Sequence, residues 1–144
     1  MSRYVASVES SRTAEDAFAY LAAFDNIRDW DPSVVFARRL DEGALRVGSA
    51  FEVVVRQGSK ETPLRYEVRA YDPAGSITVE ALASAYRSLD TITVIPRGEG
   101  SAMTYDALLE PRGLLRLATP LVNRSFKKLA EDAQRGLERV LNPS

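Results

Sequence analysis

The feature that most constrains the fold is a run of short alternating segments with no helical pattern between them. Turn sequences, such as the Asp-Pro-Ala-Gly of residues 72–75, separate these segments. They lie at residues 34–40, 50–56, 63–71, 77–81, 89–95 and 102–109. Strands joined only by turns pair with their neighbours along the chain, so this run predicts an antiparallel sheet. A further alternating segment at residues 4–8 predicts a seventh strand.

Helical periodicity appears on both sides of the six central strands. Thr13 is a predicted N-cap, with Asp16 at the capping-box position of a helix that ends near residue 25. Residues 26–30 predict one further short turn of helix, stopped by the Asp-Pro pair at residues 31–32. Residues 120–141 predict a long C-terminal helix, since Thr119 and Pro120 fit an N-cap followed by proline at the first helical position.

The C-terminal helix carries one apolar stripe. Its members recur at helical spacing: Val122, Phe126, Leu129, Ala133, Leu137 and Val140. A helix of about 22 residues is ~33 Å long, so we expect it to lie across the sheet. One helix does not fill the concave side of a strongly bent sheet, and an apolar cavity between helix and sheet is expected. Gly136 beside the stripe predicts close packing against a strand, because glycine otherwise only lowers helix propensity.

Two residue types are absent from the 144 residues: cysteine and histidine. Their absence excludes disulfides, thiol nucleophiles, Ser-His-Asp triads and the common zinc sites. The carboxylates show no metal-ligand spacing, so we expect neither a metal nor a cofactor. Any acid–base catalysis would have to use carboxylates, Tyr, Lys or Arg.

Length and charge set the broad class of protein. A chain of 144 residues is the size of one domain, taken as residues 1–144. The net charge of -1 and pI of about 5.6 argue against a nucleic-acid partner. No apolar run reaches the roughly 20 residues of a membrane span, and the N-terminus lacks the apolar core of a signal peptide. We therefore expect a cytoplasmic protein, either a monomer or a homodimer.

Three segments carry a resemblance to a known family. They are the Phe-Asp-Asn-Ile-Arg-Asp-Trp-Asp-Pro of residues 24–32, the hairpin at residues 98–106 and the helix that starts at Pro120. With this element order, essentially the whole chain resembles the polyketide cyclase/dehydrase-like branch of the START/Bet v 1 superfamily. The resemblance implies an α+β helix-grip fold. In that fold one strand, two helices, six strands and a final helix build a curved antiparallel sheet around a long helix and an apolar pocket.

The resemblance implies a bulky apolar ligand without naming a reaction. The superfamily includes aromatase/cyclases, lipid and sterol carriers, hormone receptors and quinone-binding proteins. In the aromatase/cyclases an inward Ser and Arg pair falls on the strand that corresponds to residues 63–71, and a further inward Arg follows on the next strand. Those positions are Val68, Ala70 and Ala83 here. These departures favour binding, or a different reaction, over the same cyclisation chemistry.

The expected pocket contains aromatic and apolar side chains. Tyr66 and Tyr105 can donate a hydrogen bond to a ligand carbonyl, or act as general acids if their pKa falls; alternatively they are buried phenols bonded to backbone or water. Trp30, the only tryptophan, is either a ligand-stacking lid or a plug in the core. The full expected lining is Trp30, Tyr66, Val68, Val79, Leu89, Thr91, Met103, Tyr105, Phe126, Leu129 and Ala133.

Two acidic residues depend on strand register. Asp90 and Asp106 would raise one another's pKa if the hairpin placed them side by side, which is an acid–base signature. The parity that puts Leu89 and Tyr105 inside places both aspartates on the outer, solvated face. A slip of one residue reverses this assignment.

A basic segment without acidic residues precedes and enters the last helix. It contains Arg112, Arg116, Arg124, Lys127 and Lys128. Arg124 and Lys128 are four residues apart and share a helix face. This face can meet an anionic membrane surface or an acidic carrier protein, or it can simply be solvated.

Three hypotheses for the function follow. The first is a binding module for a small hydrophobic molecule that is lipid-, polyketide- or aromatic-like. The second is a cyclase or dehydratase of the polyketide type, with Tyr66, Tyr105 or an inward carboxylate as the acid–base group. The third is an interaction module that uses the basic face of Arg124, Lys127 and Lys128.

Overall fold

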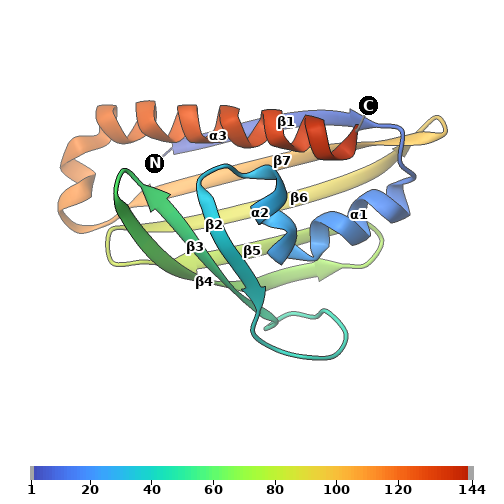
Figure 1. Cartoon of the computed structure of the whole chain (residues 1–144), viewed down its shortest axis with the longest axis horizontal. Coiled ribbons are helices and arrows are strands. Elements are labelled where there is room, and N and C mark those ends of the chain that lie inside the picture. Colours follow the sequence, from blue (N-terminus) through green and yellow to red (C-terminus); the bar gives the residue numbers. More distant parts are fainter. Residues whose placement is uncertain (1, 143–144) are drawn as a thin grey trace.

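A computed structural model describes residues 2–142, apart from the side chains of Ala118, Thr119, Leu121 and Val122. It confirms the predicted order of one strand, helices, six strands and a long helix (Figure 1). The elements are β1 (Ser2–Ser10), α1 (Ala14–Ala22), η1 (Phe24–Asn26), α2 (Ile27–Trp30), β2 (Val34–Arg39), β3 (Ala50–Gln57), β4 (Lys60–Asp72), β5 (Ser76–Leu82), β6 (Tyr86–Arg97), β7 (Gly100–Pro111), η2 (Gly113–Ala118) and α3 (Thr119–Leu141).

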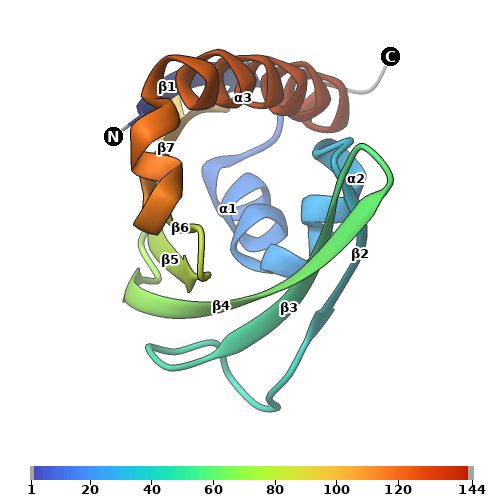
Figure 2. The ribbon, with the colours of Figure 1, turned by 90° about the vertical axis from the view of Figure 1, so that its left-hand side faces the viewer.

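The strands form one curled antiparallel sheet in the order β1-β7-β6-β5-β4-β3-β2. Strands β2 to β7 pair with their neighbours along the chain, whereas β1 pairs with β7, placing Ser2 opposite Leu109. β1 and β2 therefore lie at opposite edges of the sheet. The chain passes from one edge to the other through α1, η1 and α2, which lie inside the curl (Figure 2).

The first helix begins as its sequence predicts. The hydroxyl oxygen of Thr13 accepts a hydrogen bond from the backbone N–H of Asp16 at 3.1 Å, which satisfies one of the unpaired N–H groups of the first turn. Ala17, Phe18, Leu21 and Ala22 recur at helical spacing and are buried. This face packs α1 against β6 and β7.

The long helix α3 lies over β1 and β7 at one edge, rather than across the whole sheet (Figure 1). Its C-terminal end is fixed to β1, because the hydroxyl of Ser10 donates a hydrogen bond to the carbonyl of Leu141 at 2.7 Å. The side chains buried along α3 are Ala130, Ala133, Leu137 and Leu141. The predicted stripe is therefore only partly right.

The start of the predicted stripe is less buried than its end. Phe126 and Val140 are partly buried, but Leu129 is 36% exposed. The side chain of Val122 lies outside the described residues. The burial shifts toward Ala130 and Leu141 because α3 packs on β1, β7 and α2 along one side only.

Gly136 packs against a helix and not, as its sequence position predicts, against a strand. A Cβ atom at Gly136 would lie 1.8 Å from the carbonyl oxygen of Trp30, at the end of α2. The two backbones therefore approach to a distance that only glycine allows. This contact fixes α3 to α2 directly above the core.

Aromatic side chains fill the space between α2, α3 and the sheet. Trp30 is 1% exposed and lies edge-to-face with Tyr105 of β7, with ring centroids 5.5 Å apart. The ring centroid of Phe24, in η1, lies 5.1 Å from that of Tyr66 and 6.0 Å from that of Phe51. Trp30 is thus a plug in the core, and this part of the expected cavity beneath α3 is occupied by protein.

The predicted parity of β6 is wrong. Its inward residues are Ser88, Asp90, Ile92 and Val94, whereas Leu89 and Thr91 lie on the outer face. There Leu89 is opposite Leu108, and the hydroxyl of Thr91 is 3.0 Å from that of Thr78. Each parity of this strand carries two large apolar residues, so the hydrophobic pattern alone does not decide between them.

A β-bulge changes the parity of β4 as well. The register shifts between Val68 and Ala70, so Leu64, Tyr66 and Val68 point inward but Ala70 points outward and is exposed. Tyr71, opposite the buried Ile77, takes the inward position instead. The extra residue of a bulge reverses the alternation for the rest of the strand.

We predict that Gly136→Ala destabilises the protein. Alanine improves helix propensity by about 1 kcal/mol, but its Cβ would collide with the Trp30 carbonyl 1.8 Å away. We expect the collision to dominate, with a net loss of about 1–3 kcal/mol in the free energy of unfolding, measured by urea denaturation. Ser125→Ala, at an exposed position of the same helix, is the control and should change little. A stabilised Gly136→Ala variant would contradict the close contact.

Candidate ligand-binding site

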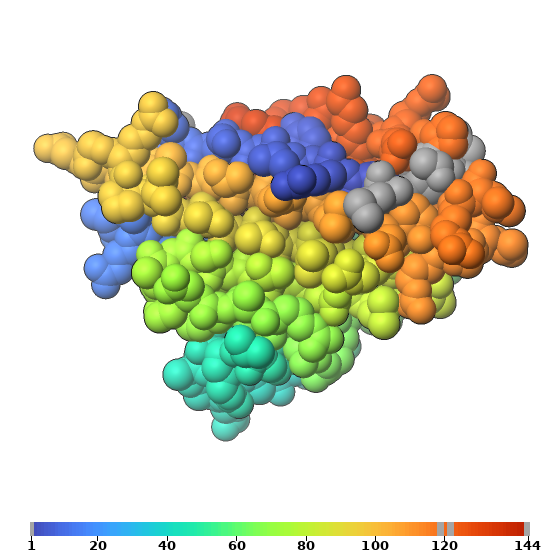
Figure 3. All heavy atoms as spheres, turned by 180° about the vertical axis from the view of Figure 1, so that it is seen from behind, coloured from blue at the N-terminus to red at the C-terminus, as the bar shows by residue number. Residues whose placement is uncertain are grey.

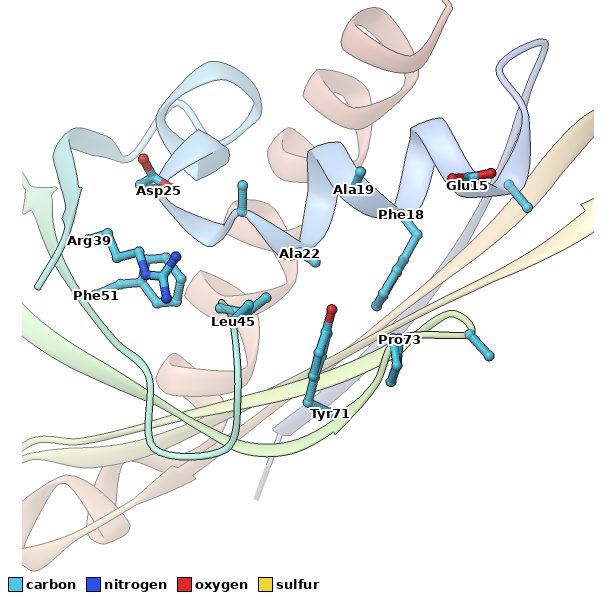
Figure 4. Close-up of a pocket in the computed structure, with 13 residues that line it drawn as sticks. Glu15, Phe18, Ala19, Ala22, Asp25, Arg39, Leu45, Phe51, Tyr71 and Pro73 are labelled. Atoms are coloured by element: carbon cyan, nitrogen blue, oxygen red, sulfur yellow. The ribbon is translucent and has the colours of Figure 1, made fainter. Parts of the chain in front are cut away.

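One pocket lies beneath α1, at the concave face of the sheet, with a volume of about 510 Å³. It is enclosed by α1 and η1 on one side and by β3, β4 and the loop before β3 on the other (Figure 4). Its lining is largely apolar: Ala14, Phe18, Ala19, Ala22, Ala23, Leu45, Phe51, Tyr71, Pro73 and Ala74, with Glu15, Asp25 and Arg39 as the charged members.

Two facing rings form the aromatic part of this pocket. Phe18 of α1 and Tyr71 of β4 are stacked, with centroids 6.2 Å apart and an interplanar angle of 14° (Figure 4). Phe18 is buried and Tyr71 is only partly buried. Tyr71 reaches this position because of the bulge at Val68 and Ala70. A flat apolar molecule is the kind of ligand that such rings favour.

Arg39 is held in place at one side of the pocket by Asp41. Its Nε and Nη2 atoms donate hydrogen bonds to the two carboxylate oxygens at 3.3 and 3.1 Å. These bonds, together with one from the backbone N–H of Ala50, hold the pKa of Asp41 well below its usual range. The lining therefore offers a fixed guanidinium, and it also contains the carboxylates of Asp25, at the same end of the pocket as Arg39, and of Glu15, at the far end of α1 (Figure 4).

A second group of functional side chains lies deeper, on the inward face of β4, β6 and β7. The phenol of Tyr66 donates a hydrogen bond to the hydroxyl of Ser88 at 3.0 Å. Ala81 of β5 is opposite both residues in the sheet, so its small side chain lets Tyr66 reach across to β6. The serine is thereby satisfied in an apolar interior.

Asp90 is the most unusual residue of this interior group. It is 4% exposed, and its Oδ2 accepts a hydrogen bond from the phenol of Tyr105 at 3.3 Å. Burial raises the pKa of Asp90 to about 7 from its ordinary 3.8, against the opposing effect of that hydrogen bond. The negative charge of Asp31 contributes in the same direction as burial. A carboxyl with such a pKa exchanges its proton near neutrality.

The two tyrosines keep their protons. Burial raises the pKa of Tyr66 and of Tyr105 well above the ordinary value of 10.0, and the charge of Asp90 adds to the effect. This is the opposite of the fall in pKa that a phenolic general acid requires. In this geometry both phenols act as hydrogen-bond donors to β6.

An aromatic wall separates the pocket from the interior polar group. Phe51 lines the pocket and contacts Phe24, which in turn contacts Tyr66. Asp90 and Tyr105 do not belong to the lining of the 510 Å³ pocket. Phe24 therefore lies between the pocket lining and this interior group.

The residues predicted to line the pocket lie in different parts of the structure. Those that point inward and are buried are Trp30, Tyr66, Val68, Val79, Met103, Tyr105 and Ala133. Phe126 is partly buried, Leu129 is exposed, and Leu89 and Thr91 lie on the outer face. None of these eleven residues lines the described pocket, which lies under α1 rather than under α3.

The aspartate pair that a different strand register would allow does not form. Asp90 is opposite Ala107 and Asp106 is opposite Thr91, so the two carboxylates lie on opposite faces of the sheet. Asp106 is on the outer face, as predicted, where Arg3 bonds it at 2.6 Å. The outer-face assignment of Asp90 is wrong, because the true parity of β6 carries it inside.

Sequence reasoning missed Phe18, Phe51 and Tyr71 as pocket residues. Phe18 is on the apolar stripe of α1, which predicts burial but not a cavity beside it. Tyr71 carries one usable signal: a large aromatic residue on the outward parity next to a small Ala70 on the inward parity. That exchange of sizes is what a bulge produces. Of the positions in the resemblance, Val68 points inward, Ala70 outward, and Ala83 lies in the turn after β5.

The curled seven-stranded sheet, the long C-terminal helix and the pocket on the concave side define a helix-grip fold. Residues 1–142 match the family described as "Polyketide cyclase / dehydrase and lipid transport", and the chain belongs to this family. A search of curated proteins finds no match.

Solved structures support the same fold. TTHA0849 from Thermus thermophilus is 16% identical, with a TM-score of 0.77, and the alignment covers 95% of this chain and 94% of that one. A START superfamily protein from Mycobacterium smegmatis is 14% identical, with a TM-score of 0.75 and 96% of both chains covered. BexL, a di-domain ARO/CYC of the BE-7585A biosynthetic pathway, is 12% identical with a TM-score of 0.74; the alignment covers 96% of this chain and 46% of BexL.

We predict that Asp90 makes stability depend on pH. Below about pH 4 the residue is protonated in both the folded and unfolded states, so it does not lower the free energy of unfolding. Between about pH 4 and 7 it ionises only in the unfolded chain, so stability falls by about 1.4 kcal/mol per pH unit. With a folded-state pKa of about 7, the total loss by pH 8 is up to about 4 kcal/mol.

Asp90→Asn should therefore be more stable than the wild type at pH 8 and nearly equal to it at pH 4, in urea denaturation at both pH values. Asp16→Asn is the matched control, since the same change at an exposed position of α1 removes no buried carboxyl. An Asp90→Asn stability difference that is constant across this pH range would contradict the raised pKa.

Proposed function

We propose that this protein binds a small, largely apolar, ring-bearing molecule in the pocket beneath α1. The observation that carries the proposal is the pocket itself, because a volume of about 510 Å³ with an apolar and aromatic lining is typical of small-molecule sites. The stacked rings of Phe18 and Tyr71 supply flat apolar surface for such a ligand.

The charged rim orients this ligand. Arg39 is fixed by Asp41 at one side of the pocket and donates hydrogen bonds rather than accepting them. A ligand carbonyl or hydroxyl is the natural partner for a guanidinium at that position. Glu15 and Asp25, the other charged residues of the lining, disfavour an anionic ligand. The proposal is therefore a neutral, oxygen-bearing aromatic or lipid-like molecule.

The family description supports this class of ligand, since it joins polyketide cyclases with lipid transport. BexL is described as an ARO/CYC of a biosynthetic pathway, which is consistent with ring-bearing substrates for this fold. Neither relation names a ligand for this chain.

Native mass spectrometry of the protein purified from cells tests the proposal, with identification of any molecule released on denaturation. We expect a near-stoichiometric apolar compound, or binding of one from a panel of fatty acids, sterols, quinones and aromatic polyketides. The variant Ala19→Trp places an indole at the exposed, pocket-lining face of α1. It should lower the affinity at least about tenfold by occupying the opening.

The matched control is Asp16→Trp, on the same helix but outside the pocket lining, which should bind normally. Equal binding by the wild type and Ala19→Trp would place the ligand elsewhere, and no binding of any panel member would count against the binding function.

An enzymatic role is a second candidate, and Asp90 is the observation that favours it. Holding a carboxyl in the interior with a pKa of about 7 opposes stability, and such groups are common at acid–base sites. As the acid, Asp90 would give its proton to a substrate carbonyl oxygen; as the carboxylate, it would take one from a neighbouring carbon. Tyr105 would position it through the bond to Oδ2.

For this role we predict that Asp90→Asn lowers turnover of a confirmed substrate by about 10²–10⁴-fold while leaving its binding intact. Asp31→Asn is the control for a nearby carboxylate whose charge acts on Asp90 without touching it, and it should shift the pH profile with little change in the maximal rate. Turnover that survives Asp90→Asn and the double Tyr66→Phe/Tyr105→Phe variant would rule out this site as catalytic.

A further inference from the structure

The short helix η2 carries the two most exposed large apolar side chains among the described residues. Leu114 is 85% exposed and Leu117 is 84% exposed. Gly113 begins this turn with φ +59°, a conformation that favours glycine, and the chain leaves β7 abruptly there. Both leucines belong to η2, the orange turn of chain before α3, which lies at one end of the molecule (Figure 1).

The base of η2 is fixed to the body of the protein. The backbone N–H of Arg112 donates a hydrogen bond to the carbonyl of Ala85 at 2.7 Å, and its Nη1 donates to the carbonyl of Ala83 at 2.8 Å. These bonds join η2 to the turn between β5 and β6. Leu82, at the start of that turn, is itself 64% exposed. Three exposed leucines therefore lie at the same end of the protein.

Positive charge surrounds the leucines along the chain. The segment from Arg112 to Ala130 contains no aspartate or glutamate, although acidic residues outnumber basic ones in the protein as a whole. Its basic residues are Arg112, Arg116, Arg124, Lys127 and Lys128. Arg124, Lys127 and Lys128 are exposed on the first turns of α3, where Lys128 reaches Asp132 at 3.7 Å with 79% of its side chain accessible.

A space-filling view shows this segment as a projecting end of the molecule, in orange (Figure 3). The convex shape of this end limits the kinds of partner that can bind it. A protein partner would need a complementary pocket for each protruding leucine, whereas the interfacial region of a bilayer is fluid and accepts apolar side chains directly. Basic residues beside them are attracted to anionic headgroups.

We propose that η2 and the first turns of α3 form a peripheral docking surface for an anionic lipid bilayer. Leu114 and Leu117 enter the interface, and Arg124, Lys127 and Lys128 contact the lipid phosphates. No helix within residues 2–142 is long and apolar enough to cross a bilayer. The docking surface is separate from the pocket beneath α1, whose lining contains none of these residues.

Co-sedimentation of the full chain with lipid vesicles tests this proposal. We expect binding to vesicles of phosphatidylcholine with phosphatidylserine, weak binding to phosphatidylcholine alone, and weaker binding as salt rises. Leu114→Ser/Leu117→Ser and Lys127→Glu/Lys128→Glu should each lower the partition coefficient about tenfold or more.

Two matched controls keep the interpretation specific. Val47→Ser changes an apolar residue that is 60% exposed in the loop before β3. Arg28→Glu/Arg65→Glu reverses two exposed charges elsewhere on the protein. Both should bind vesicles like the wild type, and circular dichroism of every variant checks its folding.

Three outcomes would overturn the proposal. One is equal binding to neutral and anionic vesicles, and another is no binding to either. The third is loss of binding in the lysine variant but not in the leucine variant, which would indicate a purely electrostatic site suited to an acidic protein.

Discussion

The contact between Gly136 and the carbonyl of Trp30 is the constraint on which the arrangement of helices depends. It brings α3 against α2 closely enough for the indole to reach Tyr105 on β7. The aromatic cluster of Phe24, Trp30 and Tyr105 then occupies the concave side next to α3. Space for a ligand remains at the other end, between α1 and the bulged end of β4. The close approach of these two backbones thus lies on the filled side of the curled sheet, and the pocket lies on the other.

The sequence was sufficient for the architecture because the evidence for it is redundant. Turn signals and alternation predicted the strands, the cap at Thr13 predicted the first helix and the apolar stripe predicted the last one, and all seven strands and the long helix are present. The site was harder to predict because single residues decide it. The extra residue of the bulge in β4 turns Tyr71 inward where simple alternation predicts Ala70. In β6 the pattern allows either parity, and the inward position is taken by Asp90 rather than by Leu89. The hydrophobic pattern of a strand does not identify its inward face where apolar residues occur on both faces. The inward face of β6 carries Asp90, which the phenol of Tyr105 bonds, and such a contact between strands is not visible in the pattern of one strand.

The concave side combines two chemically different regions. The pocket beneath α1 is apolar with a charged rim, whereas the interior of β4, β6 and β7 holds a serine, an aspartate and two phenols that satisfy one another. Phe24 contacts the aromatic side chains of both regions. Phe24 belongs to a three-residue helical turn rather than to a strand of the sheet, so its place between the two regions depends on how η1 joins α1 to α2.

The pairing of β1 with β7 has a consequence for the order of folding. Strands β2 to β7 meet their partners across short turns, so their contacts close small loops. β1 is the first strand to leave the ribosome, yet its partner is the last, with Ser2 facing Leu109. Joining them closes a loop that contains nearly every other strand, a slow step by the usual relation between contact order and rate. During synthesis β1 therefore remains unpaired, and it can join the sheet only after β7 has left the ribosome.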